Sequence, residues 1–226
     1  MAYKVFIGVG HGGSDPGAVG KVKEAAANLT IALELKRILE ANGFKVGISR
    51  TKDENDPLTE EIKEANAFKP DLAVEVHNNA GGGDGFEVFV QTNGYKAKSK
   101  AAAQTIEKQV KAIGQKSRGI KTRLNSSGKD YFGWLRQVNA PAVLLEGFFV
   151  DSNDALGFDT AAEQKKLAAA YAQGVLDYFG VKANSSRESA RQTVQSKAGL
   201  SDSTMAYLDK YQWATDLFEK LAKAMK

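Results

Sequence analysis

The amino-acid sequence predicts an α/β fold, in which helices flank both faces of a twisted, largely parallel sheet and a small helical appendage follows at the C-terminus. Three observations lead to this prediction. Apolar, strand-like runs alternate with helical periods as far as Gly180. Three of these runs end on a histidine or a glutamate at the start of a loop. A polar junction then separates this part from a second amphipathic stripe.

The first half of the chain contains the clearest elements. Residues 5–9 form a β-branched, apolar run typical of a buried strand, and it stops at a glycine-rich turn. A helical period follows from Glu24 and ends before Gly43, a natural helix stop. Residues 44–49 are expected to form a second strand, and 58–68 a helix closed by Lys69-Pro70. Residues 72–77 form a third apolar run.

The second half continues the alternation. Residues 86–90 alternate as a strand, 96–113 follow a helical period that ends at Gly114, and 141–146 form another buried strand. Residues 118–134 are less regular, with short strands expected around Ile120 and Phe132. A helix over 160–179 then stops at Gly180.

Composition limits the possible functions. The chain has 226 residues, 42% of them hydrophobic, which suffices for one ample domain and an appendage. Its 31 basic residues only slightly exceed its 27 acidic ones and form no long run, so no nucleic-acid partner is expected. The net charge of +4 suits mild attraction to an anionic polymer such as a bacterial wall. Without cysteine, a metal would have to be held by histidine and carboxylate.

Targeting signals are also missing from the sequence. The N-terminus leads directly into the first strand without an apolar leader, and no run approaches the ~20 apolar residues of a membrane span. We therefore expect synthesis as a soluble cytoplasmic protein without signal peptide and without membrane span.

Three strands end on residues with metal or proton chemistry, namely His11, His77 and Glu146. Carboxyl ends of parallel strands meet at one sheet edge, where ligands bind. A single strand-end histidine is most simply a satisfied polar residue, but these are the chain's only two, and Glu24 begins the helix after the first. Together His11, Glu24 and His77 would give zinc three ligands and leave a fourth position for water.

A rival motif overlaps the first histidine, because Gly8 to Gly13 reads G-x-G-x-x-G after a strand. A dinucleotide site requires the helix to open directly on these glycines and an acidic residue to end the second strand. Here Ser14-Asp15-Pro16-Gly17 intervenes and the second strand ends in Ser49-Arg50. A phosphate-binding P-loop also fails, because no Gly-Lys-Ser/Thr follows.

Several motifs together resemble the zinc-dependent N-acetylmuramoyl-L-alanine amidases of autolysins, spore-lytic enzymes and phage endolysins, from about Val5 to Gly180. They are Val9-Gly-His-Gly-Gly-Ser-Asp-Pro-Gly-Ala18, Glu24, Arg50-Thr-Lys-Asp53, Val76-His-Asn-Asn-Ala80, Gly85-Phe-Glu-Val88 and Pro141-Ala-Val-Leu-Leu-Glu-Gly-Phe-Phe-Val-Asp-Ser-Asn153. The resemblance implies zinc on His11, Glu24 and His77, Glu146 as the catalytic carboxylate, and cleavage of the amide between muramic acid and L-alanine.

Two positions depart from the family pattern. The family usually has a small residue where this chain has Glu75, and often an arginine near the position of Glu61. Glu75 and His77 are two apart in a strand and leave the same face. Glu75 therefore either accepts a hydrogen bond from the ligand histidine or is a partly solvated strand glutamate. Glu87, on the following strand, is left out of the predicted site.

The C-terminal part, residues 182–226, is expected to be separate from a catalytic domain over 1–181. Helices are expected near 187–198, around Met205 and Leu208 with a Ser201 or Ser203 cap, and along a stripe from Ala214 to Met225. With seven basic and five acidic side chains from residue 184 on, this tail is no polybasic anchor. It is either a wall-recognition or self-association element, or a set of helices docked on the core, which is the commoner fate of such a stripe.

The sequence thus favours a hydrolase acting on bacterial peptidoglycan at the cell wall, with Zn²⁺ as cofactor. A phage endolysin released by another protein is the simplest source without a leader, although an autolysin exported by another route has the same features. Another zinc-dependent wall peptidase is the alternative, followed by a non-catalytic wall-binding protein.

Overall fold

The computed structural model describes residues 2–183, 185–211 and 214–225. The chain forms two compact units, Met1–Val181 and Lys182–Lys226. Within the described residues the first unit has one mixed sheet of six strands in the order β2-β1-β3-β6-β4-β5. The strands are β1 (Lys4–Val9), β2 (Lys45–Ile48), β3 (Leu72–Asn79), β4 (Phe86–Val90), β5 (Ser117–Lys121) and β6 (Ala142–Phe149).

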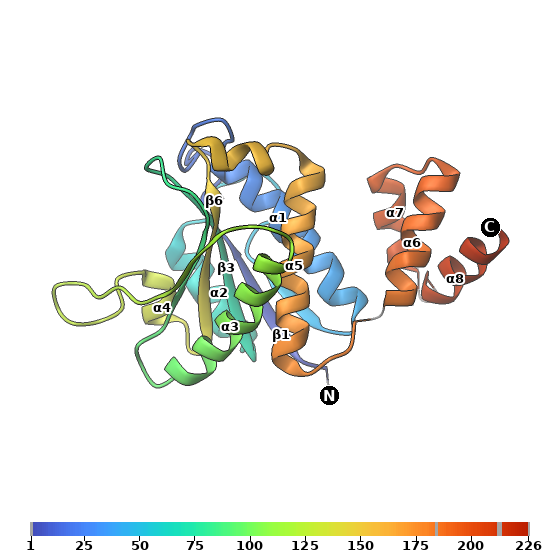
Figure 1. Ribbon diagram of the computed structural model, residues 1–226. Coiled ribbons are helices and arrows are strands. Elements are labelled where there is room, and N and C mark those ends of the chain that lie inside the picture. The colour runs from blue at the N-terminus through green and yellow to red at the C-terminus, as the bar shows by residue number, and fades with distance from the viewer. Residues whose placement is uncertain (1, 184, 212–213, 226) are drawn as a thin grey trace. The chain divides into compact units, whose positions relative to one another are not determined.

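The predicted fold class is confirmed. All neighbouring strands run parallel except β4 and β6, which pair antiparallel. The helices are α1 (Glu24–Ala41), α2 (Leu58–Phe68), α3 (Lys96–Ala112), α4 (Gly133–Gln137) and α5 (Ala161–Phe179), with a 3-10 turn, η1, at Asn153–Gly157. One core cluster joins the sheet to α1, α3 and α5, and a second joins it to α2 and α4. Helices therefore cover both faces (Figure 1).

Side-chain alternation assigns the site residues to one face. In β3, Val74 and Val76 belong to the core under α1, α3 and α5, whereas Ala73 belongs to the core on the other face. His77 therefore leaves the sheet on the face that carries α2 and α4. In β6, Leu144 lies on that same face, and Glu146 follows it by two residues. Both polar side chains thus emerge above the apolar layer formed by α2 and α4.

Three strand predictions need correction. No strand forms at Phe132, which instead precedes α4 as its N-terminal flanking residue. His77 and Glu146 are not the last residues of their strands, because β3 continues to Asn79 and β6 to Phe149. The extra length is stabilised by pairing that the sequence does not reveal: β6 lies between β3 and β4 and bonds to both. Glu146 consequently sits inside the sheet rather than at its rim.

The second unit is a small helical assembly with α6 (Ser185–Ala198), α7 (Asp202–Asp209) and α8 (Ala214–Ala224). The Ser201 side chain accepts from the Thr204 N–H and so begins α7, as one of the two predicted caps. The predicted stripe is buried inside this unit, in a cluster of Ala190, Val194, Met205, Ala214, Phe218 and Ala222. Its apolar face therefore has partners within the tail itself.

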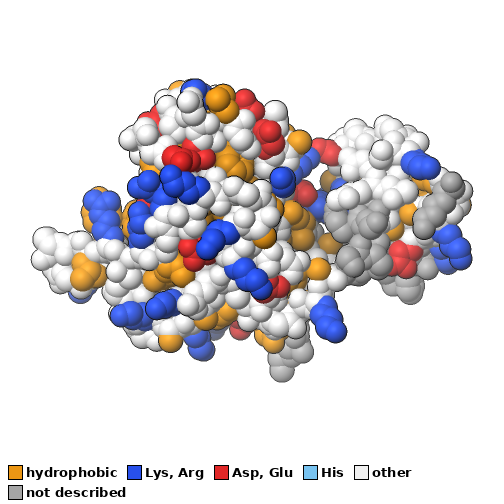
Figure 2. All heavy atoms as spheres, in the orientation of Figure 1, with side chains coloured by type: hydrophobic (Ala, Val, Ile, Leu, Met, Phe, Trp, Pro, Cys, Tyr) orange, Lys and Arg blue, Asp and Glu red, His pale blue; other side chains and the backbone are white. Residues whose placement is uncertain are grey.

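The surface and helices give two further results. In the face shown in Figure 2, Lys and Arg side chains are interspersed with Asp and Glu. This mixture differs from the continuous basic face of a nucleic-acid binder. Among the described helices, none combines the length and the apolar character required to cross a membrane.

Because each unit buries its own apolar cluster, we predict that a chain ending at Ala183 folds without the tail. Its thermal unfolding, followed by near-ultraviolet circular dichroism, should have the same midpoint as the transition of Met1–Val181 in the full chain. An insoluble product, or a midpoint lowered by several degrees, would show that the tail helices cover apolar surface of the first unit.

Candidate functional site

His11, Glu24 and His77 form a compact group of potential metal ligands. One ligand atom from each lies within 4.8 Å of the others. Glu24 is the first residue of α1 and is buried, and its Oε1 lies 3.3 Å from His11 Nε2 and 3.0 Å from His77 Nδ1. The two imidazole rings meet edge to face with centroids 4.9 Å apart. The structure therefore brings together all three residues that the sequence singled out as ligands.

The backbone before His11 is shaped to allow this approach. His11 has a φ of 63°, which is uncommon for a residue other than glycine and typical of functional sites. A Cβ on Gly10 would lie 2.2 Å from His77 Cε1, so only glycine leaves room for the second imidazole. The Gly10 carbonyl accepts from buried Arg50 and Asn28 side chains. These bonds hold the strand end in place.

A second carboxylate contacts each imidazole on its other nitrogen. Asp15 Oδ2 lies 2.8 Å from His11 Nδ1, and Glu75 Oε1 lies 3.3 Å from His77 Nε2. For Glu75 this is the acceptor position considered from the sequence. Asp15 was missed as an imidazole partner, although its spacing of four residues in the Asp-Pro-Gly turn was the available signal. Such contacts fix the ring orientation and tautomer of metal-binding histidines.

The charges in this group depend on one another. Burial alone would raise the pKa of Glu24, but hydrogen bonds to His11 and His77 outweigh burial and lower it. Hydrogen bonding to Glu24 raises the pKa of His11. Burial disfavours the charged form of His77, yet Glu24 and Glu75 raise its pKa well above the ordinary value. The pocket between these side chains thus favours positive charge, and its nitrogen and carboxylate donors fit zinc.

Glu146 lies beside this group, on the neighbouring strand. It is the register partner of His77 in the parallel β3–β6 pair. Its Oε2 is buried and has no hydrogen-bond partner among the described residues. Burial raises the pKa of Glu146 to about 7, with further increases from Glu24 and Glu87 and an opposing effect of His77. A carboxyl group with this pKa can exchange protons near neutrality.

Glu75 also faces a second buried glutamate, Glu61 of α2. Glu61 Oε1 accepts from the Val9 N–H at 2.8 Å and from the Ser49 hydroxyl at 2.8 Å. Burial and the Glu75 charge raise the pKa of Glu61 well above its ordinary value. Glu75 is likewise buried, and its Oε2 has no hydrogen-bond partner among the described residues. Glu61 and Glu75 therefore lie together behind His77.

Glu87, which the sequence analysis left out, lies next to Glu146 as its partner in the antiparallel β4–β6 pair. It is buried and forms ion pairs with Arg118 and Lys121. Burial would raise the pKa of Glu87, but these two cations lower it. A row of charged side chains thus extends from His77 across the sheet. Sequence alternation in β4 placed Glu87 near the same edge, but only the pairing with β6 places it beside Glu146.

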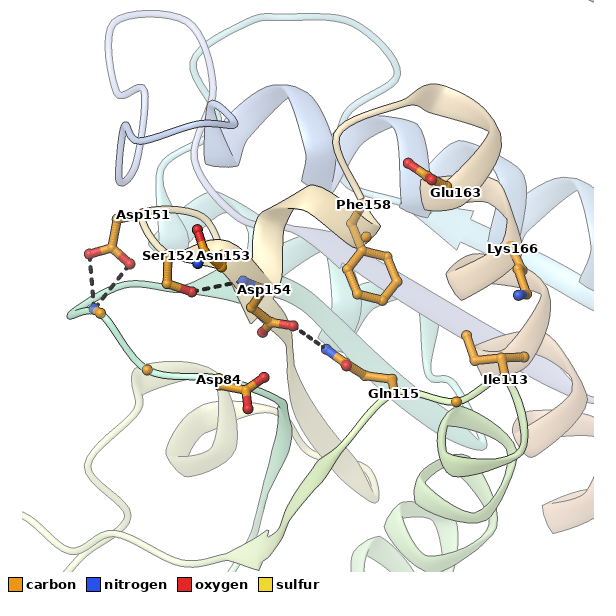
Figure 3. Close-up of a pocket in the computed structure, with 14 residues that line it drawn as sticks. Asp84, Ile113, Gln115, Asp151, Ser152, Asn153, Asp154, Phe158, Glu163 and Lys166 are labelled. Carbon is orange, nitrogen blue, oxygen red and sulfur yellow. Dashed lines mark hydrogen bonds between the residues drawn. The ribbon is translucent and has the colours of Figure 1, made fainter.

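A separate pocket of about 940 Å³ lies among the loops after β3 and β6, the end of α3 and the start of α5 (Figure 3). None of the metal-ligand group, nor Glu146, lines it. Its acidic side chains are engaged in the protein, since Asp151 accepts from Gly81 and Gly82 and Asp154 accepts from Gln115. We therefore do not include this pocket in the candidate site.

Sequence comparison places the chain among known enzymes. A family model described as N-acetylmuramoyl-L-alanine amidase matches residues 5–177. The sporulation-specific N-acetylmuramoyl-L-alanine amidase of Bacillus subtilis is 36% identical over 188 residues, which cover 81% of this chain and 71% of that protein. The endolysin of Bacillus phage SPP1 is 34% identical over 200 residues, which cover 82% and 69% of the two chains.

Solved structures agree with this result. Cwp6 from Clostridium difficile superimposes with a TM-score of 0.76 at 34% identity, over 79% of this chain and 29% of that larger chain. The catalytic domain of CwlV, an N-acetylmuramoyl-L-alanine amidase from Bacillus (Paenibacillus) polymyxa, gives a TM-score of 0.70 at 31% identity, over 80% and 99%. The chain therefore belongs to the family of N-acetylmuramoyl-L-alanine amidases, peptidoglycan hydrolases that cleave the amide between N-acetylmuramic acid and L-alanine.

Proposed function

We propose that this amidase is a zinc enzyme in which His11, Glu24 and His77 hold the metal and Glu146 transfers protons. The observation that carries the proposal is the position of Glu146, register partner of His77 and beside a group of three ligands. Histidine and carboxylate are suitable zinc ligands, and three of them leave one coordination position open. Bound there, zinc would polarise the scissile carbonyl and lower the pKa of water toward ~7.

The protein supplies the orientation of the site. The buried Glu24 carboxylate contacts both imidazoles, so the ligand set is assembled around one negative charge. Asp15 and Glu75 accept from the outer nitrogens and leave His11 Nε2 and His77 Nδ1 free to face the metal position. This arrangement gives Glu75 a positioning role and no contact with substrate.

Glu146 then provides the proton transfer that amide cleavage requires. An amine is a poor leaving group until it is protonated. The Glu146 carboxylate would take a proton from the attacking water and deliver it to the nitrogen of L-alanine. Its pKa of about 7 suits both steps, because each protonation state is accessible at neutral pH. A surface glutamate with an ordinary pKa would accept the proton but hold it too weakly.

The two alternatives give different expectations. A zinc peptidase of the wall would use the same ligands but cut inside the stem peptide. A non-catalytic wall-binding protein would not need Glu146 or an open metal position. The position of Glu146 beside three potential metal ligands favours an enzyme, and the family match favours the muramoyl amide over a peptide bond.

For the tail we propose recognition of the cell wall, and for the protein we propose delivery to the wall by phage-type release. Its buried cluster leaves Tyr207 and Tyr211 exposed, at 77% and 55%. The chain ending at Ala183 should then cleave a soluble muropeptide normally and lyse intact cells more slowly. Equal rates on both substrates would contradict this proposal.

The ligand assignment predicts the zinc content of variants. His11→Ala and His77→Ala should each lose zinc, because two remaining ligands rarely hold it in water. Glu146→Gln is the matched control and should keep one zinc per chain. Metal analysis after dialysis measures this directly. Full stoichiometry in both histidine variants would rule out the assigned ligands, and zinc loss in Glu146→Gln would make Glu146 a ligand.

The catalytic assignment is tested by the products. Mass spectrometry of digested peptidoglycan should show new L-alanine amino termini, whereas cleavage inside the stem would indicate the peptidase. Glu146→Gln should form the same products with a rate lowered on the order of 10²–10⁴-fold, the usual contribution of general acid–base catalysis. Near-normal activity in this folded variant would exclude the mechanism.

The raised pKa of Glu146 predicts a pH-dependent stability of the metal-free protein. Below its ordinary pKa of 4.5 the carboxyl group is protonated in folded and unfolded chains alike. Between this value and about 7 only the unfolded chain loses the proton, so folding loses stability as pH rises, on the order of 3 kcal/mol in total.

Glu146→Gln removes this penalty. With a chelator present, the variant should therefore resist urea better than the natural chain at pH 8 and about equally at pH 5. Titrating groups that do not interact with Glu146 cancel in this comparison because both proteins contain them, whereas His77, whose pKa the Glu146 charge raises, adds a smaller difference. Parallel stability curves across this range would show that Glu146 ionises like an ordinary glutamate.

A further inference from the structure

The charges of the chain are unevenly distributed around the candidate site. Residues 116–136, here called the basic segment, contain six Lys and Arg residues and one acidic residue, whereas the whole chain has a net charge of +4. Residues 50–64, the acidic segment, contain six Asp and Glu residues and three basic ones. The basic segment therefore has a net charge of +5 and the acidic segment a net charge of −3.

The acidic segment lies on the β1 side of the site. The Gly13 N–H donates to Asp53, and the Ser14 N–H donates to Asn55, so this segment borders the loop that follows His11. Glu61, from the same segment, accepts from Val9 at the end of β1. A part of the substrate that extends from the proposed metal position toward β1 would therefore lie near negative charge.

The basic segment lies on the opposite side. It includes β5, which pairs with β4 at the far edge of the sheet, and it extends from the body between β5 and α4 (Figure 1). Arg118 and Lys121 both contact Glu87, the strand partner of Glu146. Two cations on one carboxylate leave a positive excess. Of the Arg118 guanidinium nitrogens, only Nε bonds to Glu87, and neither terminal nitrogen has a hydrogen-bond partner among the described residues. The guanidinium lies over the Phe149 ring at 5.0 Å, and the side chain is 37% exposed.

The two halves of the substrate also differ in charge, as the two sides of the site do. The lactyl carboxyl group of N-acetylmuramic acid is consumed in the scissile amide, so the sugar half carries no ionised carboxylate. The stem peptide carries at least its C-terminal carboxylate. We propose that Arg118 and Lys121 bind a carboxylate of the stem peptide, which places the peptide half over β4 and β5 and the glycan half toward α2. This inference rests on the proposed function and adds the direction in which the substrate lies.

The dimensions of the sheet allow this contact. Neighbouring strands lie about 4.8 Å apart, so β5 is roughly 14 Å from β3, and long basic side chains shorten this span. An extended peptide advances about 3.3 Å per residue, so a carboxylate two or three residues beyond the scissile amide comes within reach. The free edge of a guanidinium can bind a carboxylate with two parallel hydrogen bonds, which gives direction as well as affinity.

The test compares two soluble muropeptides that differ only in whether the stem carboxylates are free or converted to amides. The full zinc-loaded chain should prefer the free acid by about ten-fold in kcat/KM, a typical effect for one charge-assisted contact. Arg118→Gln and Lys121→Gln, each of which leaves one cation on Glu87, should reduce this preference to near unity mainly through KM. Arg118→Lys should restore part of it.

Arg123→Gln is the matched control. It removes the same charge from the basic segment, but this guanidinium lies over the Tyr131 ring at 3.8 Å and forms no ion pair with Glu87 among the described residues. It should keep the preference of the natural chain. An equal loss in Arg123→Gln would mean that general electrostatic attraction acts here, and a natural chain without any preference would mean that no carboxylate is recognised. Either result overturns the proposal.

Inhibition by the released peptides gives a second measurement that needs no variant. The free acid should inhibit the natural chain about ten-fold more strongly than the amidated peptide, and equal inhibition would contradict the proposal. Failure of the natural chain to cleave either muropeptide at L-alanine would instead overturn the proposed function, and the carboxylate contact with it. The two failures are therefore distinguishable.

Discussion

The site depends on one buried carboxylate, Glu24, which two imidazoles share. A buried charge without partners is strongly destabilising, so the fold must bring the ends of β1 and β3 to the first turn of α1. This requirement explains the glycine at position 10, where any Cβ would collide with the His77 ring. It also explains why Arg50 is buried, since its guanidinium binds the carbonyls of Val9, Gly10 and Ala25 and joins the strand end to the helix start.

The charged side chains of the site lie in a row across the sheet rather than inside a closed cavity. His77 on β3, Glu146 on β6 and Glu87 on β4 are consecutive partners in register. The antiparallel strand makes this possible, because β4 presents Glu87 to Glu146 and β5 adds two cations behind it. Each negative group therefore has a different environment. Hydrogen bonds to two imidazoles lower the pKa of Glu24, and two cations lower the pKa of Glu87. Burial raises the pKa of Glu146 to about 7, because the opposing effect of the imidazoles is smaller.

Two buried glutamates, Glu75 and Glu61, lie behind the proposed metal position. Glu75 contacts the outer nitrogen of His77 and also faces Glu61, whose pKa is raised well above its ordinary value by burial and by the Glu75 carboxylate. The pair therefore carries less negative charge than two free glutamates would. Glu75 and Glu61 would influence the metal only through the His77 imidazole. The basic segment would act on the opposite side of the site, by binding a charged group of the substrate.

Local patterns in the sequence predicted the α/β class, the positions of His11, Glu24, His77 and Glu146, and the separate amphipathic stripe, because apolar period and glycine stops are properties of short segments. They could not predict that β6 lies between β3 and β4, since alternation reports whether a strand is buried but not which strand lies beside it. That order alone extends β6 past Glu146 and joins Glu146 to Glu87. The contact of Asp15 with His11 depends equally on the folded loop, because its side-chain geometry exists only after the His11 backbone adopts a positive φ.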